Sequence, residues 1–291
     1  NSKIIPILGV FALAAYRLIP SITRIGNYLQ DMKFCLPAVE PYMNDRSHKN
    51  FNEKPLLDLV KNSKLKLKNK ISINNLTYKF PGTENKILED LDLEIKKGQC
   101  IGIRGESGAG KTTLINIILG LLKPSNGKVL IDDINIIDNT EDWQRLISYI
   151  PQNVFITDDK IINNIALGEV SEKIDMKKIN SSLRTSRIYE FVSSLPRGVD
   201  TNCGELGEKL SGGQRQRIGI SRALYRNSEV LIFDEFTNFL DSKNEKNILQ
   251  EIKQMNDKTR IIVSHNLEVL KYCDAVCIKS RTDFNSPVAT T

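Results

Sequence analysis

The sequence is poor in the residues that build metal centres and disulfide frameworks. Its 291 residues include two histidines, one tryptophan and five cysteines. The cysteines are scattered at Cys35, Cys100, Cys203, Cys273 and Cys277, an odd number without a zinc-type pair of pairs. Cys273 and Cys277 could be read as a metal fragment, but two buried small side chains are the favoured interpretation. This cysteine usage argues against a disulfide-rich secreted fold and favours a reducing compartment, the cytosol.

The signs of a nucleic-acid-binding protein are also missing. The net charge of +6 comes from interspersed lysines and glutamates, and no stretch is Arg-rich with interleaved aromatic residues. We therefore expect a solvated lysine-rich surface and no nucleic acid partner. With 40% hydrophobic and 26% charged residues, the composition suits a globular body of one large or two modest domains.

One long apolar run opens the sequence, NSKIIPILGVFALAAYRLIPSI, without a leading Met. Its length suits a bilayer span, interrupted by Arg17 and Pro20. It has no small-residue cleavage site, which argues against a signal peptide. Because the run is apolar on all sides, we interpret residues 1–55 as the C-terminal end of a transmembrane domain, with a buried core helix as the alternative. Pro37 and Pro41 are expected to break any long helix.

The rest of the chain divides by composition. Residues 56–70 form a charged linker, 71–280 a domain and 281–291 a tail. Apolar alternation predicts two strands early in this domain, from 71 to 80 and from 87 to 95. The region from about 155 to 225 is typical of an inserted helical subdomain.

Two short apolar runs near the end of the domain, EVLIFDEF and RIIVSH, flank a segment with helical spacing. Strand, helix and strand in this order indicate a βαβ unit, with both strands buried in a mainly parallel sheet. The sequence therefore predicts an α/β fold.

A phosphate-binding loop is the strongest motif. Gly105, Gly110, Lys111 and Thr112 match G-x-x-x-x-G-K-[ST] between a predicted strand, CIGIR, and a predicted helix, residues 112–122. Glycines let backbone N–H groups approach phosphates, Lys111 reaches the β- and γ-phosphates, and the Thr112 hydroxyl ligates Mg²⁺. The predicted nucleotide-binding residues here are Gly105, Glu106, Ser107, Gly108, Ala109, Gly110, Lys111, Thr112 and Thr113.

An acidic pair, Asp234 and Glu235, follows the strand VLIF. Beside a phosphate loop, a strand-end aspartate is expected to hold Mg²⁺, and a second carboxylate can polarise the attacking water. Adjacent residues on a strand point to opposite sides, so we expect the strand to bend here and bring both carboxylates to the nucleotide.

A second phosphate-binding helix start lies far from the first, at KLSGGQRQRIGISRAL. Together with GESGAGKTT, YIPQ, LIFDE, FLD and IIVSH, in their order, this stretch resembles the nucleotide-binding domain of ABC transporters. The resemblance covers about residues 71–278. It implies a P-loop ATPase fold of the ABC type, with an antiparallel β subdomain and a helical subdomain, binding ATP and Mg²⁺.

The resemblance also implies roles for single residues. Phe80 is similar in position to the aromatic residue that stacks on adenine, with Tyr78 as the alternative. Gln152 resembles the glutamine that contacts Mg²⁺ and the water, and His265 the histidine at the γ-phosphate. Asp241 resembles the aspartate of the loop after the acidic strand. Catalysis would then rest on Glu235, His265 and Gln152, and Mg²⁺ on Thr112, Gln152 and Asp234.

The signature residues of this family correspond to Ser211, Gly212, Gly213 and Gln214. In the family, the signature of one subunit closes over the γ-phosphate held by the other. The resemblance therefore implies a head-to-tail pair, a homodimer by preference, that contacts the coupling helices of a membrane domain. The arginines of the following helix, Arg215 and Arg217, then need no nucleic acid.

The N-terminal run and the loop with Glu205 are similar to those of exporters that join membrane and nucleotide domains in one chain. We expect the C-terminal part of a half-transporter, similar to lipid-linked saccharide flippases, in the cell inner membrane with its nucleotide domain on the cytoplasmic side. Phe236 and Phe239 depart from the family's usual Pro-Thr and Ser-Ala-Leu-Asp residues. The end, from Cys277 on, lacks the usual hairpin.

Two alternatives belong to other classes. A soluble ABC-type ATPase would keep the loop, the signature and the acidic pair, but would lack the apolar N-terminal segment. A non-hydrolysing regulatory module would have a substituted Glu235 or His265, and neither is substituted.

Overall fold

The fold is that of a computed structural model, which describes residues 4–48, 65–106, 108–279 and 288–289. The chain divides into two compact units, Asn1–Asn62 and Ser63–Thr291.

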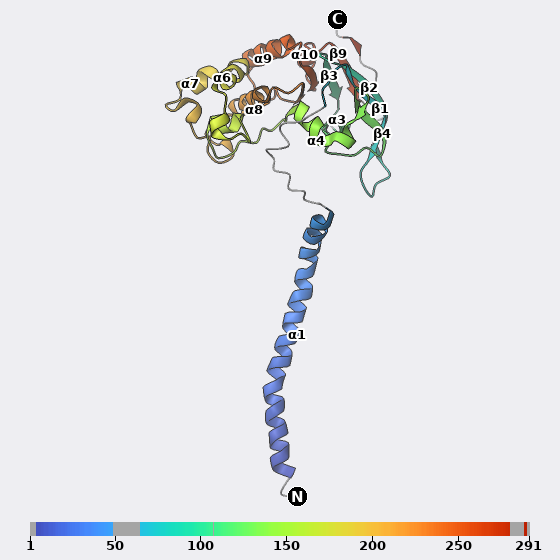
Figure 1. Cartoon of the computed structure of the whole chain (residues 1–291), viewed down its shortest axis with the longest axis vertical. Coiled ribbons are helices and arrows are strands. Elements are labelled where there is room, and N and C mark those ends of the chain that lie inside the picture. Colours follow the sequence, from blue (N-terminus) through green and yellow to red (C-terminus); the bar gives the residue numbers. More distant parts are fainter. Residues whose placement is uncertain (1–3, 49–64, 107, 280–287, 290–291) are drawn as a thin grey trace. The chain divides into compact units, whose positions relative to one another are not determined.

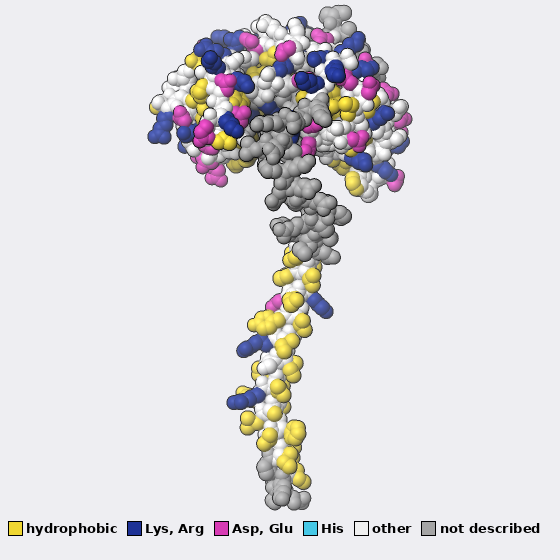
Figure 2. All heavy atoms as spheres, viewed as in Figure 1, with side chains coloured by type: hydrophobic (Ala, Val, Ile, Leu, Met, Phe, Trp, Pro, Cys, Tyr) yellow, Lys and Arg dark blue, Asp and Glu magenta, His cyan; other side chains and the backbone are white. Residues whose placement is uncertain are grey.

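The described part of the first unit, residues 4–48, is the helix α1 (Ile4–His48) (Figure 1). Its segment Ile7–Val39 is long and apolar enough to cross a membrane, and none of it is buried. On the face shown in Figure 2, most coloured side chains of the helix are apolar, with a few basic and acidic side chains among them. The prediction that Pro37 and Pro41 break the helix is wrong. Each proline removes one backbone donor, and this local loss does not end the helix of 45 residues.

The second unit is built on two sheets. The larger sheet has the order β10-β9-β3-β8-β7-β6. Its strands from β9 to β6 are parallel, and β10 runs antiparallel to β9. The bounds are β3 Cys100–Gly105, β6 Ile147–Ile150, β7 Val230–Asp234, β8 Thr259–Val263, β9 Ala275–Lys279 and β10 Val288–Ala289. The predicted βαβ unit is confirmed, because β7 and β8 are parallel neighbours joined through α9 (Ser242–Gln254).

The smaller sheet is antiparallel, with the order β2-β1-β4-β5. Its strands are β1 Lys70–Lys79, β2 Lys86–Lys96, β4 Asn126–Ile131 and β5 Ile134–Asn135. Buried residues of this sheet, of β3 and of α3 (Lys111–Ile118) form one hydrophobic cluster. Figure 1 shows β1, β2 and β4 at one end of this unit and α6, α7 and α8 at the other. The predicted antiparallel β subdomain is thereby confirmed.

Most of the other helices lie in the chain between β6 and β7. The remaining α-helices of the unit are α4 Thr140–Leu146, α5 Ile161–Ile165, α6 Met176–Thr185, α7 Tyr189–Ser194, α8 Gly212–Arg226 and α10 Leu267–Leu270, and the 3₁₀ turns are η1 Ile136–Asn139, η2 Ser171–Lys173, η3 Gly198–Asp200 and η4 Glu205–Gly207. A cluster of buried residues separate from the sheet core extends from Ile156 to Tyr225. The helical segment therefore has its own core.

Two boundaries differ from the sequence prediction. Leu65 and Leu67, assigned to the linker, are buried in the sheet core, so the domain starts before Ile71. The helix after the phosphate loop ends at Ile118 instead of residue 122. Gly120 there has a φ of 72° and the N–H of Leu121 bonds back to Asn116, which closes the helix.

Two further expectations from the sequence concern the end of the chain and the cysteines. After Cys277, the two-residue strand β10 returns beside β9, while residues 280–287 between them lie outside the described part. Cys273 and Cys277 are buried at 3% and 0% exposure, as the interpretation as small core side chains requires.

Candidate nucleotide-binding site

The phosphate loop connects the end of β3 to the start of α3. Gly108 and Gly110 have φ values of 79° and 89°, which only glycine adopts at little cost. The Lys111 ammonium donates to the carbonyl oxygens of Gly105 and Glu106, 2.8 Å from each. The backbone turn therefore has the conformation in which N–H groups can surround an anion. Ser107, one of the predicted loop residues, lies outside the described residues.

The acidic pair stands at the edge of the parallel sheet where β7 ends. Asp234 is the last residue of β7, and Glu235 has a φ of 44°, in the left-handed region. The predicted bend is confirmed: this conformation turns the chain so that both side chains line one cavity. A non-glycine residue held there costs of order 1–3 kcal/mol, which packing of the surrounding loop has to offset.

Asp234 is partly buried and bonded to a tyrosine. The hydroxyl of Tyr149, on the neighbouring strand β6, donates to Asp234 Oδ2 over 3.0 Å. Burial raises the pKa of Asp234 and Glu235 adds to that rise, while the Tyr149 hydrogen bond and Lys111 lower it. In the same way, burial and the Asp234 charge raise the pKa of Tyr149, so the phenol stays protonated and remains a donor. A cation beside Asp234 would favour its charged form.

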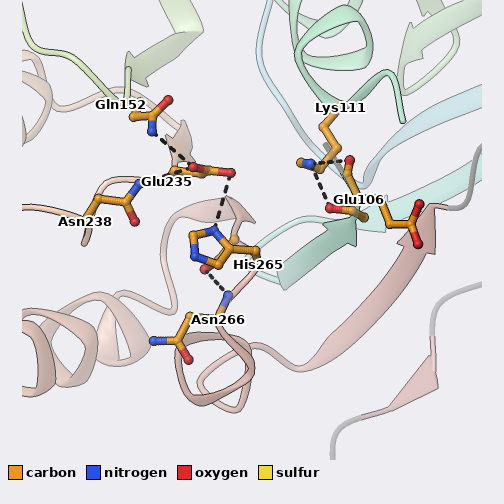
Figure 3. A network of polar contacts seen from close by, with 9 residues as sticks. Glu106, Lys111, Gln152, Glu235, Asn238, His265 and Asn266 are labelled. Atoms are coloured by element: carbon orange, nitrogen blue, oxygen red, sulfur yellow. Dashed lines mark hydrogen bonds and ion pairs between the residues drawn. The ribbon is translucent and has the colours of Figure 1, made fainter. Parts of the chain in front are cut away.

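Three side chains surround the carboxylate of Glu235 (Figure 3). Gln152 Nε2 and Asn238 Nδ2 both donate to Oε2, at 3.2 Å each. His265 Nδ1 lies 3.6 Å from the other oxygen, Oε1. The loop after β6, the loop after β7 and the loop after β8 thus supply one residue each around a single carboxylate.

Glu235, Gln152 and His265 line one cavity of about 640 Å³, and Asn238 is not among the described residues of its wall. Phe80 contributes to its wall and is 44% exposed, whereas Tyr78 is 5% exposed and part of the sheet core. The two rings meet edge to face, 5.3 Å apart. An exposed ring can stack on a planar ligand, and a buried one cannot. The lining residues are Phe80, Ile87, Gly105, Gly108, Gly110, Lys111, Thr112, Thr113, Gln152, Asp234, Glu235 and His265.

The cavity offers oxygen ligands to a hard cation. Thr112, Asp234 and Gln152 all line it, and their side chains carry a hydroxyl, a carboxylate and an amide oxygen. Within the described residues, no group of three His, Cys, Asp or Glu side chains could hold a metal by itself. This donor set suits Mg²⁺, which is usually bound through one or two carboxylates together with substrate phosphates and water.

The signature residues lie elsewhere. Ser211 caps α8: its hydroxyl accepts from the Gln214 N–H at 3.3 Å, and the Gln214 side chain accepts from the Ser211 N–H at 2.7 Å. None of the predicted signature residues is among the described residues that line the cavity. Asp241 caps α9 by accepting from the N–H of Asn244, also away from the cavity.

The basic residues behind the signature have partners within the chain. Arg215 donates to the carbonyl of Leu210 at 2.7 Å, and Arg217 to that of Arg187 at 2.8 Å. Their guanidinium groups tie the helical segment together, so the structure gives them a role that needs no nucleic acid.

Sequence reasoning missed Tyr149 and Asn238. Asn238 follows Glu235 by three residues, a spacing typical of a turn, so a signal was present. Tyr149 precedes Gln152 by three residues, but its contact with Asp234 depends on β6 and β7 being neighbours in the sheet. That neighbour relation cannot be read from either strand.

Comparison with known proteins places this site in a family. A family model described as ABC transporter matches residues 88–238, just over half of the chain. The ATP-dependent lipid A-core flippase of Francisella novicida is 37% identical over 215 residues, 73% of this chain and 36% of the flippase. The chloroplastic ABC transporter B family member 29 of Arabidopsis thaliana is 32% identical over 267 residues, 91% of this chain and 42% of that protein.

A solved structure, that of a bacterial Atm1-family ABC exporter with ATP bound, matches with a TM-score of 0.71 and 29% identity. The match covers 76% of this chain and 39% of the exporter chain. The chain thus spans less than half of the length of these relatives.

Proposed function

The chain belongs to the ABC transporter family, and on that premise we propose that it is the ATP-binding and hydrolysing motor domain of an exporter or flippase. One observation carries the proposal. Lys111, Asp234, Glu235, Gln152 and His265 line one cavity, while the signature residues do not. The first fact supports ATP hydrolysis, and the second supports a site that two copies complete.

ATP binding is assigned to the cavity wall and the phosphate loop. Phe80 stacks on adenine, and the N–H groups of the loop surround the phosphates. Lys111 exchanges its two carbonyl partners for the β- and γ-phosphates. Thr112, Asp234 and Gln152 would hold Mg²⁺, which would neutralise charge on the phosphates. The remaining loop residues, Glu106, Ser107, Ala109 and Thr113, complete the predicted nucleotide contacts.

Hydrolysis is assigned to the second carboxylate. Glu235 takes a proton from the water that attacks the γ-phosphorus, and the bond from that phosphorus to the bridging oxygen of ADP breaks. Gln152 orients the water and His265 contacts the γ-phosphate. These groups act mainly by placement and electrostatics, since phosphoryl transfer needs no covalent protein intermediate.

The second copy supplies the rest of the site. Ser211, Gly212, Gly213 and Gln214 form a helix N-terminus whose N–H groups favour an anion, yet they stand outside the cavity of their own chain. We assign them to the γ-phosphate held by the partner copy, with Asp241 at the same interface. ATP then binds a closed pair more tightly than an open one and shifts the equilibrium toward closure.

The proposed location is the cell inner membrane, with this domain on the cytoplasmic side and coupling helices of a membrane domain as partners. Helix α1 supports it, because its exposed apolar segment Ile7–Val39 suits a lipid environment. The names of the flippase relatives support lipid flipping or export as the driven step. A soluble ABC-type ATPase is not favoured, because it would have no use for such a helix.

Substitution of Ser211 tests the composite site. Ser211→Arg places bulk and charge at the start of α8 and should abolish ATPase activity while leaving the ATP affinity of the unpaired chain unchanged, because the chain's own cavity is untouched. Ser211→Ala is the matched control: it removes the same helix cap, worth about 1 kcal/mol, without adding bulk. We expect the alanine variant to retain part of the activity. Loss of ATP affinity in the unpaired arginine variant would contradict the composite site.

A further inference from the structure

Asn238 is a neighbour of Glu235 that stands outside the predicted catalytic set. Its amide donates to Glu235 Oε2 at 3.2 Å, the same oxygen that receives Gln152 at 3.2 Å. With two N–H donors on Oε2, the oxygen left to accept a proton is Oε1. His265 does not occupy Oε1, because its Nδ1 at 3.6 Å is beyond hydrogen-bond distance.

The loop that carries Asn238 is fixed at both ends. Phe236 is buried and its ring packs on Phe233 with centroids 4.8 Å apart. Asp241, at the other end, caps α9. Between them, the N–H of Leu240 donates to the Thr237 carbonyl at 2.9 Å. Asn238 therefore sits on a closed turn rather than on a free segment.

Phe239, next to Asn238, rests on the start of α8. Its ring is half exposed, and a Cβ at Gly212 would lie 3.1 Å from its Cδ1. A Cβ at Gly213 would lie 2.7 Å from the Phe239 carbonyl oxygen. Two glycines are thus required for the loop to lie this close. The neighbours Asn238 and Phe239 contact, respectively, the carboxylate of the cavity and the helix start outside it.

We propose that Asn238 is a positioning residue for Glu235, and that Phe239 sets its place by resting on Gly212. The inference depends on the proposed function, in which Glu235 activates water and Gly212 serves the partner copy. Asn238 holds Oε2 so that Oε1 faces the water. Because Phe239 ties the same turn to α8, movement of that helix start on closure reaches Glu235 through two adjacent residues.

The test compares three variants of the full chain in steady-state ATP hydrolysis. Asn238→Ala should lower kcat about tenfold and leave KM for ATP within about twofold, since a hydrogen bond to a charged acceptor is lost. Asn238→Asp keeps the shape but replaces the donor with a negative charge, so kcat should fall further. Asn244→Ala is the matched control: it removes an amide bonded to Asp241 at the other end of the loop, and should behave as wild type.

A purely structural role for Asn238 predicts a different order. The isosteric aspartate would then retain more activity than alanine, and Asn244→Ala would lose as much as Asn238→Ala. Either result overturns the inference, as does a change in KM with kcat unaltered. Failure of the proposed function is seen separately: the wild-type chain would not hydrolyse ATP, or Glu235→Gln would hydrolyse it at the wild-type rate. Asn238 is exposed, so all variants should fold.

Discussion

Two glycines of the phosphate loop allow a matched prediction of stability. Gly108 and Gly110 both have left-handed φ values, 79° and 89°. They differ in what surrounds them. A Cβ at Gly108 would have nothing within 4 Å, whereas a Cβ at Gly110 would lie 2.9 Å from Ile87 Cγ2 and 3.2 Å from the Ile87 carbonyl oxygen. Alanine at either position therefore has the same conformational cost, and only Gly110→Ala adds a steric one.

The magnitudes follow from these two costs. A left-handed alanine costs roughly 1–2 kcal/mol, and overpacking a close contact adds typically about 1–3 kcal/mol. For a domain of this size, 1 kcal/mol lowers Tm by about 2–4 °C. Gly108→Ala should lower Tm by about 4 °C and Gly110→Ala by about 10 °C, in the absence of nucleotide.

The assay is thermal unfolding followed by intrinsic fluorescence. The chain has one tryptophan, Trp143, which is fully buried in the sheet core, so fluorescence excited selectively at tryptophan reports on this unit and not on α1. Equal losses for the two variants, or a larger loss for Gly108→Ala, would refute the steric argument and show that Ile87 gives way without cost.

Three further predictions concern single contacts. Burial raises the pKa of Asp234, and the Tyr149 hydrogen bond opposes that rise, so Tyr149→Phe should raise the pKa of Asp234 further. Mg²⁺-dependent ATP binding, titrated from about pH 8 down to pH 4, should then be lost at a higher pH in the variant than in wild type. Burial raises the pKa of Asp132, but bonds from the N–H groups of Lys70, Lys68 and Asn69 lower it overall. Asp132→Asn should therefore lower the free energy of unfolding, measured by chemical denaturation at neutral pH, by about 1 kcal/mol. This difference between variant and wild type should vanish as pH falls through the lowered pKa of Asp132. Phe239→Ala should give a kcat between those of wild type and Asn238→Ala, while Phe239→Tyr keeps the ring on Gly212 and the wild-type rate; an unchanged rate in the alanine variant would contradict the coupling.

The sequence predicted those parts of the fold that local patterns determine. Alternation indicated β1 and β2, and glycine spacing indicated the phosphate loop between β3 and α3. The bend at Glu235 followed from the opposite directions of adjacent strand residues, and its φ of 44° confirms it.

What escaped prediction depends on contacts between distant segments. Leu65 is buried in the sheet core, although the sequence around it is charged and has no apolar pattern that predicts this burial. The contact between Tyr149 and Asp234 needs the neighbouring strands β6 and β7. The roles of Phe80, Gln152, Ser211 and Asp241 stay predictions, because they concern a ligand or a second copy.

Glu235→Gln tests the proposed hydrolysis and the composite site most directly. This change removes the group that accepts the proton of the water and keeps the hydrogen-bonding shape of the side chain. Two labelled populations of the variant chain should associate on addition of Mg²⁺ and ATP, as measured by energy transfer between the labels, and the bound ATP should remain intact. Lys111→Ala is the control and should not associate, since its cavity lacks the ammonium group that binds the phosphates. Hydrolysis at the wild-type rate by Glu235→Gln would contradict the role of this carboxylate in activating water. ATP binding without association would contradict a site completed by two copies.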